Sequence, residues 1–216
     1  MKEEVVEIFQ SIEREIINSL TKISAPDEPV YACAFFNFYW DCENIHEPYF
    51  TYNIESSDSY RDPKLRWHSG DWIYDVHDTL GQSVRPLYVS LSQTLKSEPR
   101  DVWEKVGEYQ DAMYCEMCMK LNNTIKDQNS PFVGWSLTDD FVIGVFDYGR
   151  GNIMDELAKK SVGEDKFQKN RIFMDDPAVL HEKALQNRSS YREELMAKGI
   201  PNDTAWGLAV QKYPLP

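Results

Sequence analysis

Residues 30–40, from Val30 to Trp40, form an almost unbroken run of aromatic and other strand-favouring residues. Such residues are typical of β-strands, and here they do not alternate with polar ones. A strand with apolar side chains on both faces must be covered on both faces. We therefore expect residues 30–40 to form a central strand, with further elements packed above and below the sheet.

The other periodic segments predict the remaining elements. Residues 49–54 predict a neighbouring strand, joined to the first by a short polar loop as a hairpin, and residues 141–146 predict a second central strand. Apolar spacing predicts helices over about 3–23, 84–95 (with Pro86 in its first turn), 101–126, 152–160 and 177–198. This order predicts an α+β fold, with a small mostly antiparallel sheet packed against several helices and a peripheral C-terminal helix.

A change of composition after Gly163 suggests the organisation into domains. Residues 1–163 are expected to form a single α+β domain. Residues 164–216 are more polar, and the helix expected at 177–198 carries only a thin apolar stripe. We expect them to form a C-terminal helical extension packed on the same domain.

The segment 65–74 concentrates aromatic and charged side chains of the kind found in cores and at interfaces. Arg66 could stack on one of the neighbouring tryptophans or pair with Asp71, and the alternative is that it grips a carboxylate or phosphate. At least two of Trp67, Trp72 and Tyr74 are expected to be buried. The predicted structural or partner-binding residues are Arg66, Trp67, Asp71, Trp72 and Tyr74.

Candidates for catalysis are few. His68, Asp71 and His77, with Asp75 and Asp78 nearby, could hold a divalent metal and support a metal-assisted hydrolase, but their spacing matches no metal motif. The motifs HExxH, GxSxG, Walker A and GxGxxG do not occur. We therefore expect a protein without catalytic residues or cofactors.

The four cysteines are expected to be reduced thiols. Cys115 and Cys118 have CxxC spacing but fall within a predicted helix and lack the turn of a zinc knuckle. A four-thiolate zinc site that also uses Cys33 and Cys42 is the alternative. We predict buried thiols and no bound metal.

Charge and hydropathy favour some partners and disfavour others. With 36 acidic and 23 basic residues, the chain has a formal net charge of −13, which disfavours contact with nucleic acid and anionic membranes and favours a basic protein partner. The alternative reading is that the charge only maintains solubility. No apolar run is long enough for a bilayer, and no signal peptide is evident, so a cytoplasmic location is expected. The acidic loops predict a partner surface at Glu43, Glu47, Glu55 and Asp58.

Several of these features together resemble the bacterial domain-of-unknown-function family 4303. They are the leading amphipathic helix, the strand from Val30 to Phe35, the pair Arg66–Trp67 followed by residues 71–74, and the strand at 141–147. Residues 156–162 with Phe167 resemble the family's closing helix, although its LNP element is absent. The resemblance covers about residues 3–173.

The resemblance implies a function in toxin immunity. An immunity protein binds its cognate toxin tightly and needs no catalysis, which agrees with an acidic, aromatic-rich chain. The alternatives are the hydrolase described above and a regulatory subunit of a larger assembly. The chain itself is expected to be a monomer or a small homo-oligomer.

Overall fold

The computed structural model describes residues 2–36, 38, 40–41, 43–61, 66–72, 74–147, 153–170, 172 and 177–213. Its elements, in chain order, are α1 (Glu3–Leu20), β1 (Val30–Phe36), β2 (Tyr49–Ile54), α2 (Asp58–Arg61), the 3-10 turn η1 (Ser69–Asp71), β3 (Tyr74–Asp75), α3 (His77–Leu95), α4 (Arg100–Asn123), β4 (Leu137–Val145), α5 (Met154–Val162), α6 (Glu164–Asn170), α7 (Pro177–Ala197) and α8 (Asn202–Lys212). This is a small sheet packed against helices, so the predicted α+β class is confirmed.

The strands lie in the order β3-β2-β1-β4. β1 pairs antiparallel with β2, as the predicted hairpin requires, and β2 pairs antiparallel with the two-residue β3. On its other side β1 pairs parallel with β4, where Cys33 lies opposite Ile143. A parallel pair needs a long crossover connection, and here the crossover includes α3 and α4. β1 ends at Phe36, earlier than predicted, and Trp40 instead forms an isolated bridge with Ile45.

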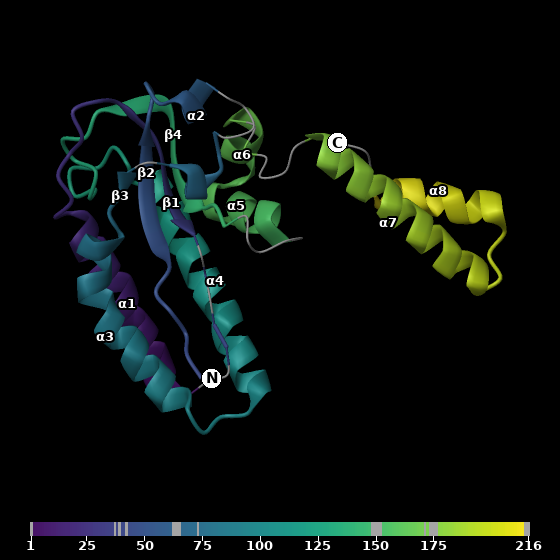
Figure 1. Cartoon of the computed structure of the whole chain (residues 1–216), viewed down its shortest axis with the longest axis horizontal. Coiled ribbons are helices and arrows are strands. Elements are labelled where there is room, and N and C mark those ends of the chain that lie inside the picture. The colour runs from purple at the N-terminus through teal and green to yellow at the C-terminus, as the bar shows by residue number, and fades with distance from the viewer. Residues whose placement is uncertain are drawn as a thin grey trace. The chain divides into compact units, whose positions relative to one another are not determined.

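Both faces of the sheet are buried, which confirms the prediction made from residues 30–40. On one face Cys33 and Phe35 of β1 join the large core cluster that includes apolar side chains of α1, α3 and α4. On the other face Ala32 and Ala34 join a smaller cluster with Trp67, Trp72 and side chains of α5 and α6. Figure 1 shows α1, α3 and α4 along one side of the strands and α5 and α6 on the other.

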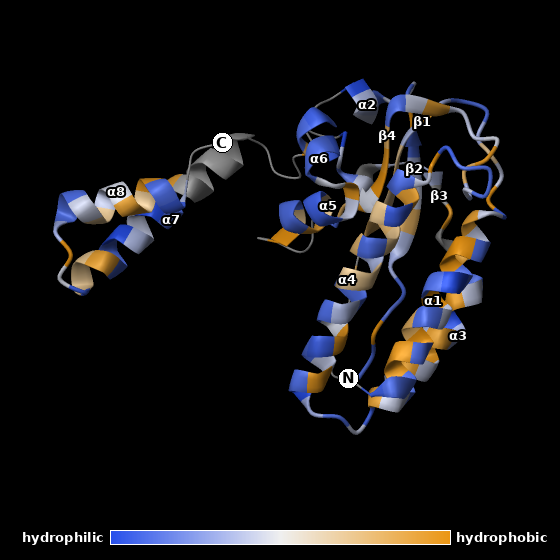
Figure 2. Ribbon diagram, turned by 180° about the vertical axis from the view of Figure 1, so that it is seen from behind, coloured by the Kyte–Doolittle hydropathy of each residue, from blue (hydrophilic) through white to orange (hydrophobic). Residues whose placement is uncertain are grey.

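The helix α3 begins seven residues earlier than predicted, and Pro86 lies in its interior rather than in its first turn. Leu80 and Val84 are fully buried and continue the apolar stripe toward the N-terminus. Proline leaves the carbonyl of the residue four positions earlier without its helical partner. Because Gln82 and Pro86 are both exposed, this carbonyl lies on the solvent side of the helix. Figure 2 shows alternating orange and blue along α1 and α3, as expected of amphipathic helices.

The chain divides into two compact units, Met1–Met174, here called the body, and Asp175–Pro216, here called the hairpin. The predicted boundary after residue 163 falls too early, because α6 belongs to the body: Phe167 and Ile172 are buried in its smaller core cluster. The extension contains α7, as predicted, and also α8, which was not predicted. Its packing on the body stays a prediction. Among the described residues no helix is long and apolar enough to cross a membrane.

Candidate functional site

The predicted segment around Arg66 forms part of the smaller core cluster. Trp67 and Trp72 are 2% and 6% exposed, so the prediction that at least two of its aromatic residues are buried is confirmed. Both indole rings meet Tyr31 and Phe146 edge-on, with centroid distances of 5.6 to 6.1 Å. This edge-to-face geometry is favoured between aromatic rings. The tryptophans therefore hold the segment against the sheet.

Arg66 adds a polar element to this cluster. Its guanidinium lies 4.3 Å from the ring centroid of Tyr60 and 5.1 Å from that of Trp67, and it forms an ion pair with Asp140. Of the two tryptophans on which Arg66 was expected to stack, the structure shows contact with Trp67. The described partner carboxylate comes from β4, whereas the side chain of Asp71 lies outside the described part. Because Arg66 is already paired and stacked, its structural role is well defined.

The backbone of Arg66 is also tied to the core. Its carbonyl accepts hydrogen bonds from the hydroxyl of Tyr31 at 2.8 Å and from Nε1 of Trp72 at 3.2 Å. Burial raises the pKa of the Tyr31 phenol above its ordinary value of 10.0. That phenol therefore stays protonated and able to donate at any neutral pH.

The metal hypothesis rests mostly on side chains outside the described part, namely those of Asp71, Asp75, His77 and Asp78. His68 is described and partly exposed. Within the residues that the structure describes, no group of three or more His, Cys, Asp or Glu side chains could hold a metal ion. Cys33, Cys115 and Cys118 are buried thiols that form no disulfide among the described residues, and burial raises the pKa of Cys33 and Cys118. Cys42 lies outside the described residues.

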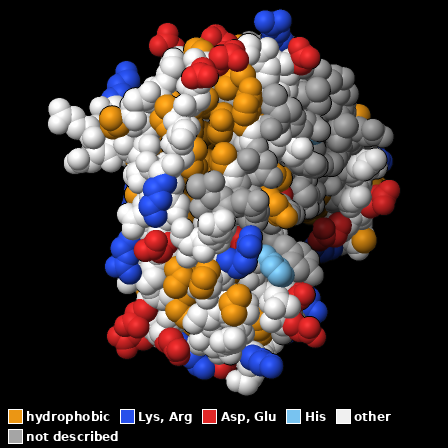
Figure 3. Space-filling model, turned by 60° about the vertical axis from the view of Figure 1, so that its left-hand side comes forward, with side chains coloured by type: hydrophobic (Ala, Val, Ile, Leu, Met, Phe, Trp, Pro, Cys, Tyr) orange, Lys and Arg blue, Asp and Glu red, His pale blue; other side chains and the backbone are white. Residues whose placement is uncertain are grey.

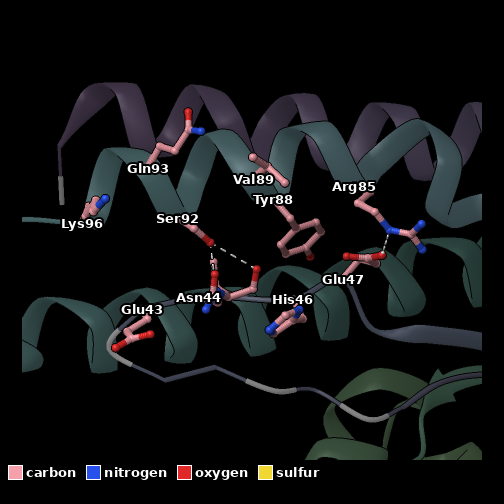
Figure 4. Close-up of a pocket in the computed structure, with 11 residues that line it drawn as sticks. Glu43, Asn44, His46, Glu47, Arg85, Tyr88, Val89, Ser92, Gln93 and Lys96 are labelled. Atoms are coloured by element: carbon pink, nitrogen blue, oxygen red, sulfur yellow. Dashed lines mark hydrogen bonds and ion pairs between the residues drawn. The ribbon is translucent and has the colours of Figure 1, made fainter.

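A hollow of about 920 Å³ lies between the segment 43–47 and α3, and we call it the α3 groove. Figure 3 shows one face of the molecule, with acidic and basic side chains interspersed around gathered hydrophobic ones. In Figure 4, Arg85 and Glu47 occupy one end of the groove and Lys96 and Glu43 the other. The remaining α3 side chains that line it are Tyr88, Val89, Ser92 and Gln93. Its volume is typical of ligand-binding and recognition pockets.

The floor of the groove is held by hydrogen bonds among buried and half-buried groups. Gln110 of α4 donates through Nε2 to the carbonyl of His46 and to the hydroxyl of Tyr88, both at 3.1 Å. The hydroxyl of Tyr88 is also 3.0 Å from that of Tyr114. Ser92 accepts from the backbone amide of Ile45 at 3.0 Å. These bonds fix the segment 43–47 to α3 and α4, so the groove is preformed.

One buried acceptor below the groove is unused. Oε1 of Gln110 has no hydrogen-bond partner among the described residues, although Gln110 is fully buried. Leaving a buried acceptor unpaired costs about 1–3 kcal/mol. This atom is therefore available for a donor from water or from a bound molecule.

The charged groups of the groove differ in how they are engaged. Nε of Arg85 lies 2.5 Å from Oε1 of Glu47, and Glu47 is only 9% exposed. Glu43 is exposed and makes no ion pair with any described residue, and the same holds for Lys96 at the same end. The two predicted acidic residues thus have different roles. Glu47 fixes Arg85, whereas Glu43 remains available to a partner.

The other two predicted acidic residues do not belong to this groove. Glu55 follows β2, whereas Glu47 precedes it, and a strand of six residues spans roughly 20 Å. Glu55 lines a separate hollow of about 540 Å³ with Tyr60, Asp139, Asp140 and Lys169, and Asp58 begins α2. The structure therefore separates the four predicted residues into two surfaces at opposite ends of β2.

Sequence reasoning missed the α3 side of the groove. Arg85 and Val89 fall within the predicted helix 84–95 and Lys96 directly follows α3, but no motif marks them. The exposed Val89, at 51% exposure, was a usable signal because it stands on an otherwise polar helix face. Gln110 and Tyr114 could not be identified from the sequence, because nothing in the amphipathic pattern of α4 distinguishes a buried polar residue from an exposed one.

Comparisons of the chain with protein-family models, with curated proteins and with solved structures found no match. The resemblance to family 4303 therefore stays a prediction.

Proposed function

We propose that this chain is a non-catalytic binding protein, an immunity protein that neutralises a basic toxin, and that the α3 groove contacts the toxin. The observation that carries the proposal is the architecture of the groove. Its floor is fixed by the hydrogen bonds described above, and its rim presents Glu43, His46, Val89 and Lys96 to solvent. A preformed floor with an exposed mixed rim suits recognition at low entropic cost.

Charge supports the choice of a basic partner. The body has 30 acidic and 18 basic residues, which attracts a basic protein over distances up to the Debye length, about 8 Å at physiological salt. Such steering raises the association rate more than the final affinity. The exposed Val89 offers an apolar contact on the rim of the groove.

The first test is the gene neighbourhood. A large secreted toxin encoded directly beside the gene for this chain supports the proposal, and neighbours without any toxin contradict it. The product of that gene is then mixed with the purified chain, and association and dissociation rates are measured at low and high salt. We expect the association rate to fall at least several-fold as the salt rises from about 50 to 200 mM.

Substitutions on the two acidic surfaces test which of them contacts the toxin. We expect Val89→Arg with Glu43→Lys to weaken binding by at least about 100-fold, because both changes lie on the groove rim. The matched control is Glu55→Lys with Asp58→Lys, which makes similar charge changes at the opposite end of β2. Glu47 is left unchanged, because reversing a buried, ion-paired carboxylate would disturb the fold. Binding that survives the first pair and is lost with the second would reject the α3 groove.

A further inference from the structure

The sequence of β4 favours pairing with another strand. In the strand order β3-β2-β1-β4 it lies at one end, so among the described residues no further strand pairs with its outer side. Residues 141–146 read Phe-Val-Ile-Gly-Val-Phe, without a charge or a proline. Segments of this kind pair readily with copies of themselves when they lie on an open edge. An open β4 would therefore be a place at which two chains join.

The outer side of β4 is instead occupied by a side-chain amide. Asn122, at the end of α4, accepts a hydrogen bond from the backbone N–H of Ile143 through Oδ1 at 3.1 Å. It also donates through Nδ2 to the carbonyl of Ile143 at 2.6 Å. These are the two backbone groups through which an edge residue binds a neighbouring strand. The amide of Asn122, which is 4% exposed, thus takes the place of a peptide group of a further strand.

Two other side chains continue along the same strand. Ser161 of α5 accepts a hydrogen bond from the backbone N–H of Val145 through Oγ at 2.9 Å. Asn170, at the end of α6, donates through Nδ2 to the carbonyl of Asp140, also at 2.9 Å. Because these residues satisfy backbone groups of β4 from three different helices, we call Asn122, Ser161 and Asn170 the β4 cap.

The direction of the backbone groups shows that the cap covers the outer edge. The N–H of Phe146 bonds to the carbonyl of Phe35 next to β1, on the inner side. Backbone groups of neighbouring residues in a strand point to opposite sides. Val145, and Ile143 two residues before it, therefore point outward, where a fifth strand would bind.

Neighbouring groups hold the Asn122 amide in this orientation. Nζ of Lys166 in α6 donates to Oδ1 of Asn122 at 3.3 Å and to its backbone carbonyl at 3.1 Å. Nδ2 also lies 3.0 Å from the carbonyl of Cys118 and 3.3 Å from that of Ser161. A cation beside the oxygen and carbonyls beside the nitrogen favour the orientation that matches Ile143. Asn122 therefore joins β4 to α4, α5 and α6, and its loss should loosen the helices over the edge.

We propose that the β4 cap keeps this edge of the sheet closed, so that two copies of the chain do not join through their β4 strands. A purely stabilising role has a different consequence, because the loss of any buried amide of α4 would then have the same effect as the loss of Asn122. The three cap residues do not line the α3 groove, so the cap acts whatever that groove binds.

The test opens the edge at two positions. Asn122→Ala frees both backbone groups of Ile143, and Ser161→Ala frees the N–H of Val145 with little change of volume. The matched control is Gln110→Ala, which removes a similarly buried amide of α4 that bonds to the carbonyl of His46, away from β4. Analytical ultracentrifugation measures the mass of each full chain at about 1 and 100 µM, and circular dichroism checks folding.

We expect the average mass at the higher concentration to rise at least about twofold for Asn122→Ala relative to the native chain. Ser161→Ala should give a smaller rise, and Gln110→Ala should keep the native mass. Amide hydrogen exchange then locates the contact. At the lower concentration the Ile143 amide should exchange at least about tenfold faster in Asn122→Ala than in the native chain, and it should be protected again in the associated form.

Three results would overturn the proposal. The first is a native mass for both cap variants in folded form, and Ser161→Ala alone decides this point if Asn122→Ala does not fold. The second is association of Gln110→Ala to the same extent as the cap variants. The third is an associated form in which the amides of β4 stay unprotected.

Discussion

The body and the hairpin differ in how far their described aromatic side chains are buried. In the body, the central strand β1 is covered on both faces, and large aromatic side chains such as Trp67 and Trp103 are almost fully buried. In the hairpin, Trp206 remains 43% exposed, although it has the same chemistry. The body is strongly acidic and the hairpin nearly balanced. Among the described residues, the large apolar clusters and the excess of negative charge therefore both belong to the body.

Tryptophan truncation should separate the two regions most clearly. Trp67→Ala removes a buried ring that contacts Tyr31 and Phe146, and it should lower the free energy of unfolding by about 3–5 kcal/mol. Trp206→Ala should change the unfolding of the body by less than about 0.5 kcal/mol. Urea denaturation followed by tryptophan fluorescence measures both. Equal losses in the two variants would contradict the distinction between body and hairpin.

Glycine substitution gives a smaller contrast with opposite signs. A Cβ added at Gly107 in α4 would lie 2.4 Å from Nε1 of Trp40, so Gly107→Ala should cost about 1–3 kcal/mol through overpacking. A Cβ added at Gly207 in α8 would meet nothing within 4 Å. Gly207→Ala should therefore stabilise the helix by up to about 1 kcal/mol. Helicity and melting temperature of the two variants should move in opposite directions, and a shared direction would refute the contrast.

Alkaline pH should act on the body through its buried phenols. Burial is the main cause that raises the pKa values of Tyr31, Tyr88 and Tyr114 above the ordinary value of 10.0. A group whose pKa is raised on folding contributes stability that is complete below its unfolded pKa and is lost as the pH rises toward its folded pKa. The free energy of unfolding should therefore fall above about pH 10.

A variant isolates one phenol. Tyr114→Phe should reduce this pH slope by up to about 1.4 kcal/mol per pH unit. The control is the same variant at neutral pH, which reports only the lost contact with Tyr88. An unchanged slope in the folded variant would show that Tyr114 does not contribute.

The elements with a strong local pattern were predictable. The amphipathic spacing of α1 and α4, and the apolar runs of β1 and β4, appear in the structure within a few residues of their predicted limits. The start of α3 was wrong because Pro86 was taken as an N-terminal signal, whereas the burial of Leu80 and Val84 overrides it. The short β3 and the helices α6 and α8 carry patterns too brief or too weak to stand out.

The candidate surfaces show the same limit. The sequence marked Glu43 and Glu47 as acidic loop residues, but only the structure pairs Glu47 with Arg85 and leaves Glu43 available. It likewise marked Arg66, but the described partner Asp140 lies 74 residues away in sequence. Ion pairs between distant segments leave no periodic trace, because each partner alone looks like an ordinary surface charge.

By itself the sequence determined the α+β class, the double coverage of β1 and the acidic character of the body, because composition and spacing act through local geometry and summed charge. The tertiary structure alone decided the parallel placement of β4 beside β1, the α3 groove and the separation of Glu47 from Glu55 across β2. These features depend on which segments meet in space. The local pattern permits many contacts between distant segments, and long-range packing selects the contacts that form.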